Sequence, residues 1–414
     1  MVRTLGAGFH LGGWRRFIIA IALGLLAVGF LYASFDQVSA IAPWRPTLPT
    51  IATFPSAPLA KACDGVQSTP ANKNSAATNA GADAPIPNIV HYIWLLADQT
   101  KFSLSFKVFI SVYSSHLFLH PDRIYFHTDV PKELWESSKK SGDLWTKRIL
   151  NIPGVTPKFI ENPRVTSKGQ EIDTFGAKSD FIRADALGEY GGMYLDVDAI
   201  PLRDVAPLRN AGFANVVGGA VVLRTKYSGF VNTGVWLSRP HSSLVEIFGR
   251  AMDAFYNGVW AISVDILTDL SFRLHAIPGE VLIMHPKAFA PTSFEVEDQE
   301  RLFRPHPGSG GANGAITGVK TESLGTTCED ALAWLAEREQ HQLPGRPHTE
   351  GWEMDFSATY VLHAFDDDAD RVRGWDGKIT LQYVLAQQSN YARAVYPAVK
   401  HAIDEGIITK EETV

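Results

Sequence analysis

The chain of 414 residues is long enough for one large domain or two smaller ones. A hydrophobic content of 45% and a charged content of 20% are typical of a folded protein with an apolar core. A net charge of −6, without a clustered run of Lys and Arg, argues against a protein that binds nucleic acid. Two cysteines, Cys63 and Cys328, are too few for a disulfide framework.

An apolar segment lies near the N-terminus. Residues Phe17–Phe35 form a run of 19 residues without a charged side chain, long enough to cross a bilayer core of about 30 Å as a helix. Arginines precede the run and Asp36 follows it, a charge order that places the N-terminus in the cytosol. A cleaved signal peptide is the alternative. We predict a cytosolic tail over residues 1–16 and a transmembrane signal anchor over residues 17–35.

The next segment, residues 36–85, is rich in Pro, Ala, Thr and Ser. Its prolines prevent a continuous helix or central strand, so we predict an extended stem. Behind the stem, residues 86–414 form the predicted catalytic domain. Anchor, stem and lumenal domain are together typical of a single-pass type II protein of the Golgi membrane, a layout that indicates location and not activity.

The globular part opens with a compact apolar run, Ile89–Leu95, which predicts a buried strand. A helix is expected over residues 106–116 and a second strand over residues 123–128. Alternation of helices and strands up to Asp198 predicts an α/β domain with a largely parallel sheet. Because ligands of such folds bind at the carboxyl ends of strands, His91 and Trp94 are candidates for contacting a nucleotide. Packing in the core is the alternative for both.

The most informative segment is Ser179–Asp198. It predicts an amphipathic helix, a break at a Gly-Gly pair, a short apolar strand and then Asp196 and Asp198, one residue apart. Because side chains alternate along a strand, the two carboxylates are expected on the same face. Two adjacent carboxylates repel each other unless one holds a proton or a cation lies between them. Mg²⁺ and Mn²⁺ prefer oxygen ligands, so the segment predicts a site for a metal and a diphosphate.

The pattern Ser-Asp-x-x-Arg-x-x-x-Leu-x-x-x-Gly-Gly-x-Tyr-x-Asp-x-Asp in this segment resembles the sugar-binding DXD region of the family 32 glycosyltransferases. That family includes fungal Golgi mannosyltransferases and is related to vertebrate α1,4-glycosyltransferases, and the run is similar to the matching stretch of clostridial glucosylating toxins. Residues 86–94, Ile-Pro-x-Ile-Val-His-x-x-Trp, resemble the opening of the same family. The resemblance implies a single GT-A-like, Rossmann-like catalytic domain, a nucleotide-sugar donor, Mn²⁺ or Mg²⁺, and retention of anomeric configuration.

Asp180 and Arg183 are three residues apart on the predicted helix and therefore share a face. A surface ion pair is one interpretation, with a contribution under about 1 kcal/mol. The other is that Asp180 fixes an arginine that binds sugar hydroxyls or phosphate. The resemblance implies the second interpretation, with both residues contacting the donor sugar and Tyr194 belonging to the same site.

Three further candidates follow. Asn232 resembles the Asn of the family's Asn-x-Gly strand, where it lies at the active site, although turn chemistry is an alternative. His363 resembles a late histidine that binds the metal or the diphosphate. Trp375 follows it in the family's order and is a candidate for stacking on the sugar or nucleotide, with plain packing as the alternative. At residues 262–268 the family's Gly-Pro is missing, which leaves the acceptor subsite undetermined.

The resemblance and these residues together imply a metal-dependent, retaining glycosyltransferase that moves a hexose to a glycan or glycolipid acceptor in the secretory pathway. The fungal relatives favour GDP-mannose over a UDP-hexose as donor. One rival is a haloacid-dehalogenase-like phosphatase, whose Asp-x-Asp normally lies on the first strand of its domain. A second is a Golgi adaptor that keeps the fold without activity. The predicted roles are catalytic for Asp180, Arg183 and Asn232, donor-binding for His91, Trp94, Tyr194 and Trp375, and metal-binding for Asp196, Asp198 and His363.

Overall fold

The structure is a computed structural model that describes residues 84–221, 228–259, 261–308, 352–356, 358–366 and 372–412, with the single positions 329 and 332. The predicted tail and anchor lie outside these residues, as do both cysteines and all but the last two residues of the predicted stem. Of the helices in the described ranges, none has the length and apolarity needed to cross a bilayer.

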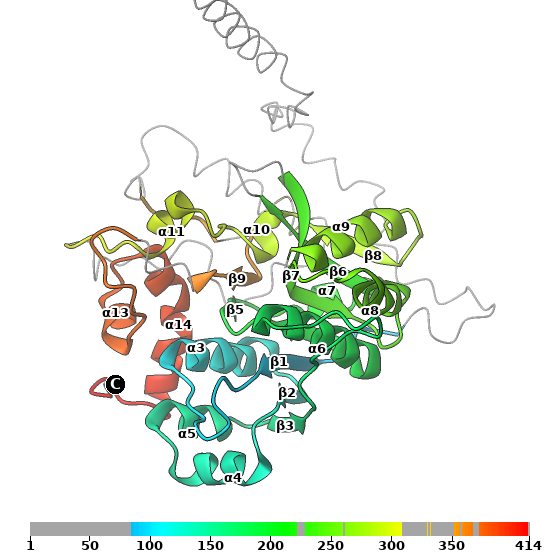
Figure 1. Ribbon diagram of the computed structural model, residues 1–414. Helices are drawn as coiled ribbons and strands as arrows, with labels where there is room; N and C mark the ends of the chain where they lie inside the picture. The colour runs from blue at the N-terminus through cyan, green and yellow to red at the C-terminus, as the bar shows by residue number, and fades with distance from the viewer. Residues whose placement is uncertain are drawn as a thin grey trace, which may run out of the picture. The chain divides into compact units, whose positions relative to one another are not determined.

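A seven-stranded sheet forms the centre of the fold (Figure 1), with the strand order β3-β2-β1-β4-β7-β6-β8. Neighbours from β3 to β4 are parallel, β7 is antiparallel to β4 and to β6, and β8 is parallel to β6. Within this sheet β7 therefore runs against the other strands, and the predicted, largely parallel α/β architecture is confirmed. The strands are β1 (Ile89–Trp94), β2 (Arg123–Thr128), β3 (Val155–Phe159), β4 (Gly192–Leu195), β6 (Asn215–Val221), β7 (Ser228–Ser238) and β8 (Val281–Met284).

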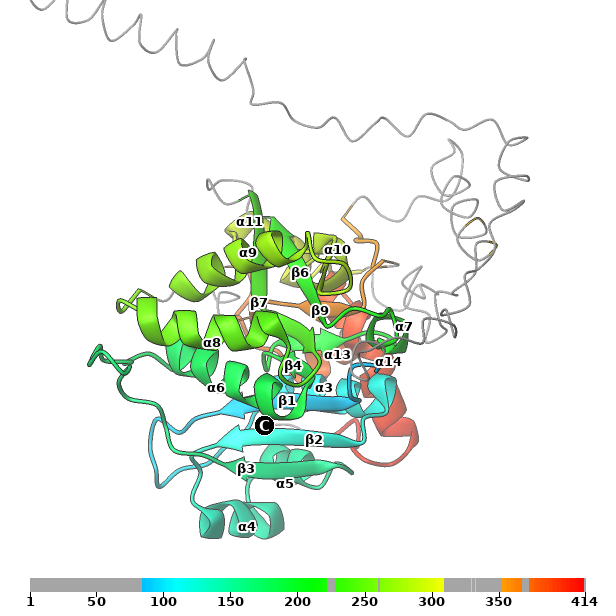
Figure 2. The ribbon, with the colours of Figure 1, turned by 90° about the vertical axis from the view of Figure 1, so that its right-hand side faces the viewer.

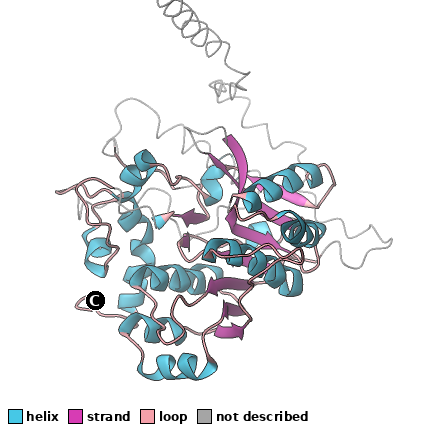
Figure 3. Ribbon diagram, in the orientation of Figure 1, coloured by secondary structure: helices cyan, strands magenta, loops and turns pink. Residues whose placement is uncertain are grey.

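A second, small antiparallel sheet pairs β5 (Ala199–Pro201) with β9 (Val361–His363). Helices lie on both faces of the large sheet (Figures 2 and 3). On one face are α6 (Phe175–Tyr190), α8 (Ser243–Phe255) and α9 (Ile262–Leu274). On the other is α3 (Phe106–Ser114), followed by a π-helical turn, Ser115–Leu119. The remaining helices are α4 (Lys132–Ser141), α5 (Leu144–Leu150), α7 (Ala206–Arg209), α10 (Pro286–Phe289), α11 (Val296–Phe303), α13 (Leu381–Ala386) and α14 (Asn390–Asp404).

The alternation of side chains along the central strands creates two cores. On β4, Met193 and Leu195 join the core that contains α3, whereas Tyr194 between them joins the core under α6 and α8. Strands β1 and β7 divide their side chains in the same way. Full burial of a large apolar side chain contributes roughly 1.5–3 kcal/mol, and a slip of one residue would exchange the two faces. The register of β4, and with it the position of the segment that follows, is therefore strongly specified.

Candidate active site

Asp196 and Asp198 lie in a turn, and not in a strand as the sequence predicted. Strand β4 ends at Leu195, and the backbone N–H of Ala199 donates to the carbonyl of Asp196 at 2.9 Å, which closes the turn before β5. The backbone N–H of Asp196 donates to the carbonyl of Gly234 on β7 at 2.8 Å. The two carboxylates therefore converge because the chain turns between two strands, and strand alternation is the wrong reason for their proximity.

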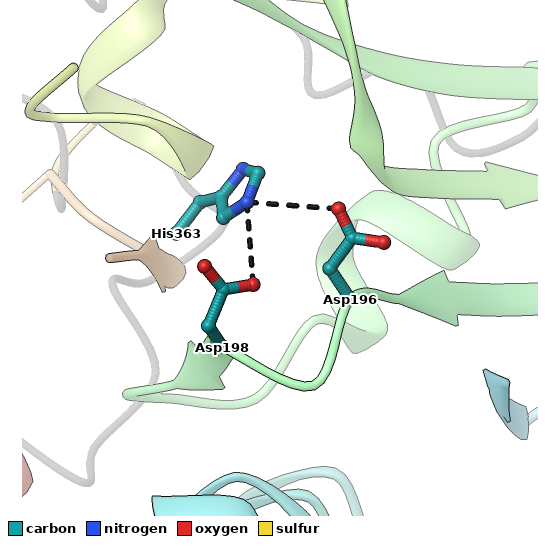
Figure 4. A group of neighbouring side chains, drawn as sticks. All are labelled: Asp196, Asp198 and His363. Atoms are coloured by element: carbon teal, nitrogen blue, oxygen red, sulfur yellow. Dashed lines mark ion pairs between the residues drawn. The ribbon is translucent and has the colours of Figure 1, made fainter. Parts of the chain in front are cut away.

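His363 completes a group of three possible metal ligands (Figure 4). The β5–β9 pairing sets His363 opposite Ala199, directly after Asp198 in the chain. Its Nε2 lies 3.6 Å from Asp196 Oδ2 and 3.4 Å from Asp198 Oδ1. One potential ligand atom from each residue lies within 4.8 Å of the others. The structure thus brings together the three residues predicted to bind a metal.

Asn232, on β7, orients the His363 ring. Its Oδ1 accepts a hydrogen bond from the backbone N–H of Gly234 at 2.7 Å and lies 3.1 Å from His363 Nδ1. Because an amide oxygen only accepts, His363 Nδ1 must carry a proton, and Nε2 is the nitrogen whose lone pair would face a cation held by the carboxylates. Two carboxylates and a neutral imidazole suit a divalent cation such as Mn²⁺, and the contact of Asn232 with the outer ring nitrogen is the usual support for such a ligand. The sugar-orienting role predicted for Asn232 stays a prediction.

Gly234 leaves space at the centre of the triad. A Cβ at this position would lie 2.4 Å from His363 Cε1 and 2.6 Å from Asp196 Oδ2. Any side chain would therefore displace the ligands or fill the room between them. In the sequence, the available signal for this role is the position of Gly234 in the Asn-x-Gly pattern, two residues after Asn232.

Arg183 lies in a buried charge network beside the triad. Its Nη2 is 3.1 Å from Asp180 Oδ1 and 3.5 Å from Asp196 Oδ1, and its Nη1 donates to the carbonyl of Thr233 at 2.5 Å. The guanidinium carbon lies 4.3 Å from the centre of the Tyr194 ring. Asp180 and Arg183 are 6% and 3% exposed, so the surface ion pair is excluded. Instead, the helix pair links directly to a predicted metal ligand.

Burial and neighbouring charges shift the pKa values in this network. Burial raises the pKa of Asp180 to about 6, although Arg183 opposes this. Burial alone would lower the pKa of Arg183, but Tyr194 and the carboxylates of Asp180 and Asp196 raise it, so the guanidinium keeps its charge. For His363, burial also acts to lower the pKa, and the nearby Asp198 raises it above its ordinary value. The site therefore holds a permanent positive charge beside Asp196.

Tyr194 contacts this network through its hydroxyl group and its ring. The side chain is 2% exposed, and its hydroxyl donates to Asp196 Oδ1 at 2.5 Å. Burial raises the pKa of the phenol well above its ordinary value, so it acts as a neutral donor. The contacts of Tyr194 in the structure orient Asp196 and Arg183, and its predicted contact with the donor stays a prediction.

His91 makes its contacts inside the protein. It is fully buried, its Nε2 lies 2.7 Å from the carbonyl of Gly191, and its Nδ1 lies 3.0 Å from Nε2 of His127. Both ring nitrogens are therefore used inside the protein, as the packing alternative expects, and the predicted contact with a nucleotide stays a prediction. His91 holds the break between α6 and β4, where a Cβ on Gly192 would lie 2.4 Å from the carbonyl oxygen of Ile89.

The two predicted tryptophans have different surroundings. Trp94 is the last residue of β1, partly buried against the core that contains α3, and its predicted contact with the nucleotide stays a prediction. Trp375 stacks on Phe303 at 5.4 Å and on Tyr383 at 4.8 Å, with interplanar angles of 11° and 25°. Its observed contacts are those of the packing alternative, and the predicted stacking on a sugar or nucleotide stays a prediction.

Comparison with known proteins points to one class. Residues 109–214 match the family described as glycosyltransferase sugar-binding region containing DXD motif, which confirms the resemblance seen in Ser179–Asp198. Glucan organizing enzyme 1 from Cryptococcus neoformans var. grubii serotype A is 24% identical over 213 residues, which are 49% of this chain and 54% of that protein. The chain thus spans about half the length of the curated relative that it matches.

Solved glycosyltransferase structures are also similar at a low level. The PaToxG glycosyltransferase has 13% identity and a TM-score of 0.32, with 70% of this chain and 88% of that chain covered. The apo form of the glycosyltransferase GlyE from Streptococcus pneumoniae TIGR4 has 12% identity and a TM-score of 0.36, with 78% and 65% covered. We draw nothing further from scores this low.

Proposed function

We propose that the chain is a metal-dependent glycosyltransferase of the GT-A type that transfers a hexose from a nucleotide sugar to a glycan or glycolipid acceptor. The observation that carries the proposal is the convergence of Asp196, Asp198 and His363 beside the buried Arg183. The match of residues 109–214 to a sugar-binding DXD region supports it. GDP-mannose is the favoured donor and a UDP-hexose the alternative. The name of the cryptococcal relative makes a glucan one acceptor to test.

The donor set fits a hard divalent cation, Mn²⁺ or Mg²⁺. Two carboxylates supply oxygen ligands, the Asn232 contact leaves the His363 Nε2 lone pair available, and Gly234 leaves the space between them open. When bound, such a cation would neutralise the charge that develops on the departing nucleotide diphosphate. Asp196, Asp198 and His363 would hold it.

The remaining residues of the site would bind and orient the donor. Arg183 offers a permanent positive charge, and Asp180, Tyr194 and the Thr233 carbonyl hold its guanidinium in place. Such fixed positioning lowers the entropic part of the barrier. Asp180 and Asp196 are both engaged with Arg183, so neither is an evident covalent nucleophile. The resemblance to family 32 implies retention, and in the absence of an evident nucleophile we propose that the acceptor hydroxyl attacks on the same face that the nucleotide leaves.

The predicted layout belongs to the same proposal. An N-terminal signal anchor over residues 17–35 and a stem over residues 36–85 would hold a catalytic domain, residues 86–414, in the Golgi lumen. The support is the apolar run and its flanking charges in the sequence. A microsomal translation assay that separates an integral, protease-protected product from a cleaved one tests this part alone.

The phosphatase alternative is not favoured. In the structure the Asp-x-Asp turn follows β4, after three earlier strands, and Oδ1 of Asp196 already accepts from the Tyr194 hydroxyl. The inactive-adaptor alternative is opposed by the geometry of the triad, since its three ligand atoms and the Asn232 support are all in place.

The decisive experiment measures Mn²⁺ binding and donor hydrolysis in parallel. The purified lumenal domain is incubated with GDP-mannose and with UDP-hexoses, with Mn²⁺ or with EDTA, and free nucleotide is quantified. We expect metal-dependent release, lost in Asp196→Asn and Asp198→Asn together with Mn²⁺ binding measured by electron paramagnetic resonance. Asp269→Asn, on the exposed side of α9, is the matched control. Full activity and unchanged Mn²⁺ affinity in both triad variants would contradict the proposal.

A further inference from the structure

A cavity of about 420 Å³ lies beside the Asp198 end of the triad. Its walls come from the N-terminal ends of α3 and α5, from the segment that leads into α13, and from Asp366, which follows β9. In Figure 1 these elements lie on the side of the sheet opposite to α8 and α9. The volume of the cavity is within the range of about 300–1,000 Å³ found for small-molecule sites.

Asp366 connects the cavity to the triad. Its backbone N–H donates to Asp198 Oδ2 at 3.3 Å, and its Oδ1 lies 2.5 Å from Nζ of Lys107, another residue of the cavity wall. Asp366 therefore contacts Asp198 with its backbone and lines the cavity with its side chain. A ligand seated in the cavity would lie within one residue of a predicted metal ligand.

The triad thus has two different flanks. Arg183, Asp180 and Tyr194 contact the Asp196 side, where the proposed function places the donor sugar. The cavity borders the Asp198 side, away from that arginine network. Transfer between two substrates needs two adjacent subsites that meet at the reacting bond, and the cavity supplies a second one.

The cavity wall combines apolar side chains, such as Phe106 and Trp145, with charges of both signs. Among the charged residues, Lys107 and Lys378 are positive and Asp143, Asp366 and Glu412 are negative, and serine, threonine and glutamine side chains also contribute to the wall. A strongly anionic ligand would meet the carboxylates, and a cationic one the ammonium groups. Sugar hydroxyls both donate and accept hydrogen bonds, so they can satisfy both kinds of partner without a net charge.

We propose that this cavity is the acceptor subsite and that it receives an uncharged oligosaccharide. The proposal rests on the proposed glycosyltransferase function and adds the place and the chemical class of the acceptor. The missing Gly-Pro of residues 262–268, which left the acceptor subsite undetermined in the sequence, is consistent with recognition by other parts of the chain.

The test fills the cavity without touching the donor side. Ser103 is exposed at the cavity wall, so Ser103→Trp narrows the space, and Lys378→Ala removes one exposed polar partner. Ser137→Trp, on the exposed face of α4 and outside the cavity wall, is the matched control. Donor hydrolysis without acceptor, Mn²⁺ affinity, and transfer to laminaribiose, cellobiose, maltose and α-1,2-mannobiose are measured for each variant, after circular dichroism has confirmed folding.

We expect acceptor KM to rise at least tenfold in Ser103→Trp and several-fold in Lys378→Ala, with donor hydrolysis and Mn²⁺ affinity within twofold of the parent. Unchanged transfer in both variants overturns the inference. An equal loss of donor hydrolysis also overturns it, because the cavity then binds the nucleotide. A parent that hydrolyses the donor but uses only a lipid-linked or anionic acceptor overturns the chemical class. A parent protein that neither binds nor hydrolyses any nucleotide sugar would contradict the proposed function itself.

Discussion

Asn232 and His363 form a contact that determines which nitrogen of the imidazole is available. The Oδ1 of Asn232, held by the backbone N–H of Gly234, lies 3.1 Å from His363 Nδ1, and this places the proton there. The opposite nitrogen, Nε2, faces Asp196 and Asp198 and is the one that would bind a cation between them. Asn232 would therefore act on a bound metal through a neighbouring side chain.

Replacing Asn232 tests this relationship directly. Asn232→Leu keeps the approximate volume but removes the acceptor, and we expect Mn²⁺ affinity to fall by about 10–100-fold, the usual effect of losing such a supporting contact. Asn232→Asp keeps an acceptor for His363 Nδ1–H, so affinity should stay close to that of the parent or exceed it. Isothermal titration with Mn²⁺ measures both. An equal loss of Mn²⁺ affinity in the two variants would show that the hydrogen-bond acceptor at position 232 does not determine metal binding.

Gly234→Ala is expected to abolish metal binding in a folded protein. The added Cβ would lie 2.4 Å from His363 Cε1 and 2.6 Å from Asp196 Oδ2, closer than any tolerated contact. Gly176→Ala is the control, because a Cβ at that position of α6 has nothing within 4 Å, and alanine in a helix is favoured over glycine by up to about 1 kcal/mol. Mn²⁺ paramagnetic resonance and thermal denaturation distinguish the two. Normal Mn²⁺ binding in Gly234→Ala would contradict the geometry of the triad.

The buried His91–His127 pair should make the domain sensitive to acid. Burial lowers the pKa of His91 to about 4 and that of His127 to about 3, from an ordinary value of 6.5. The unfolded chain therefore binds more protons below pH 6.5, and stability falls as the pH decreases. For His91 alone the loss between pH 6.5 and pH 4 is about 3 kcal/mol.

Urea unfolding at a series of pH values measures this effect. His91→Gln, which cannot be protonated, should show a flatter decline than the parent over that pH range. His241→Gln is the control, because the side chain of His241 is 75% exposed. A parent and a His91→Gln variant with parallel pH profiles would rule out a contribution from His91.

Arg183→Met should strongly destabilise the domain. The guanidinium neutralises the buried Asp180 and contacts Asp196 and the Thr233 carbonyl, and removing one partner of a buried ion pair typically costs about 3–5 kcal/mol. Arg250→Met, at an arginine whose side chain is 81% exposed, should change the free energy of unfolding by less than about 0.5 kcal/mol. Chemical denaturation measures both. A similarly small change in the free energy of unfolding of both variants would indicate that water screens the charge of Arg183.

Local pattern was sufficient to predict much of the fold. The apolar run at Ile89–Leu95 is β1 with one residue fewer, and the expected strand at residues 123–128 matches β2. Both segments are short, largely buried and contain β-branched residues. For such segments, periodicity and burial predict the same structure, a strand. The strand that carries His363, β9, is only three residues long, because it pairs with the equally short β5 and not with the main sheet.

The site could be predicted only in part. Asp196, Asp198 and His363 come together as expected, since the long pattern around the Asp-x-Asp and the late histidine carried enough information. Donor contacts were predicted for His91, Tyr194 and Trp375 because their residue types suit nucleotides and sugars, but the protein groups around them could not be predicted. Their roles depend on which distant groups fill the space beside them, such as the Gly191 carbonyl for His91, and no local pattern contains that.

The pairing of β5 with β9 has a consequence for how the domain holds together. His363 lies far along the chain from the Asp196–Asp198 turn that it contacts. A bound cation would therefore tie together two segments that are separated in sequence by β6, β7, α8 and α9. Such a tie closes a long loop and removes freedom from the unfolded chain. Metal loading would then govern resistance to proteolysis of the segment that carries β9, as well as readiness for catalysis.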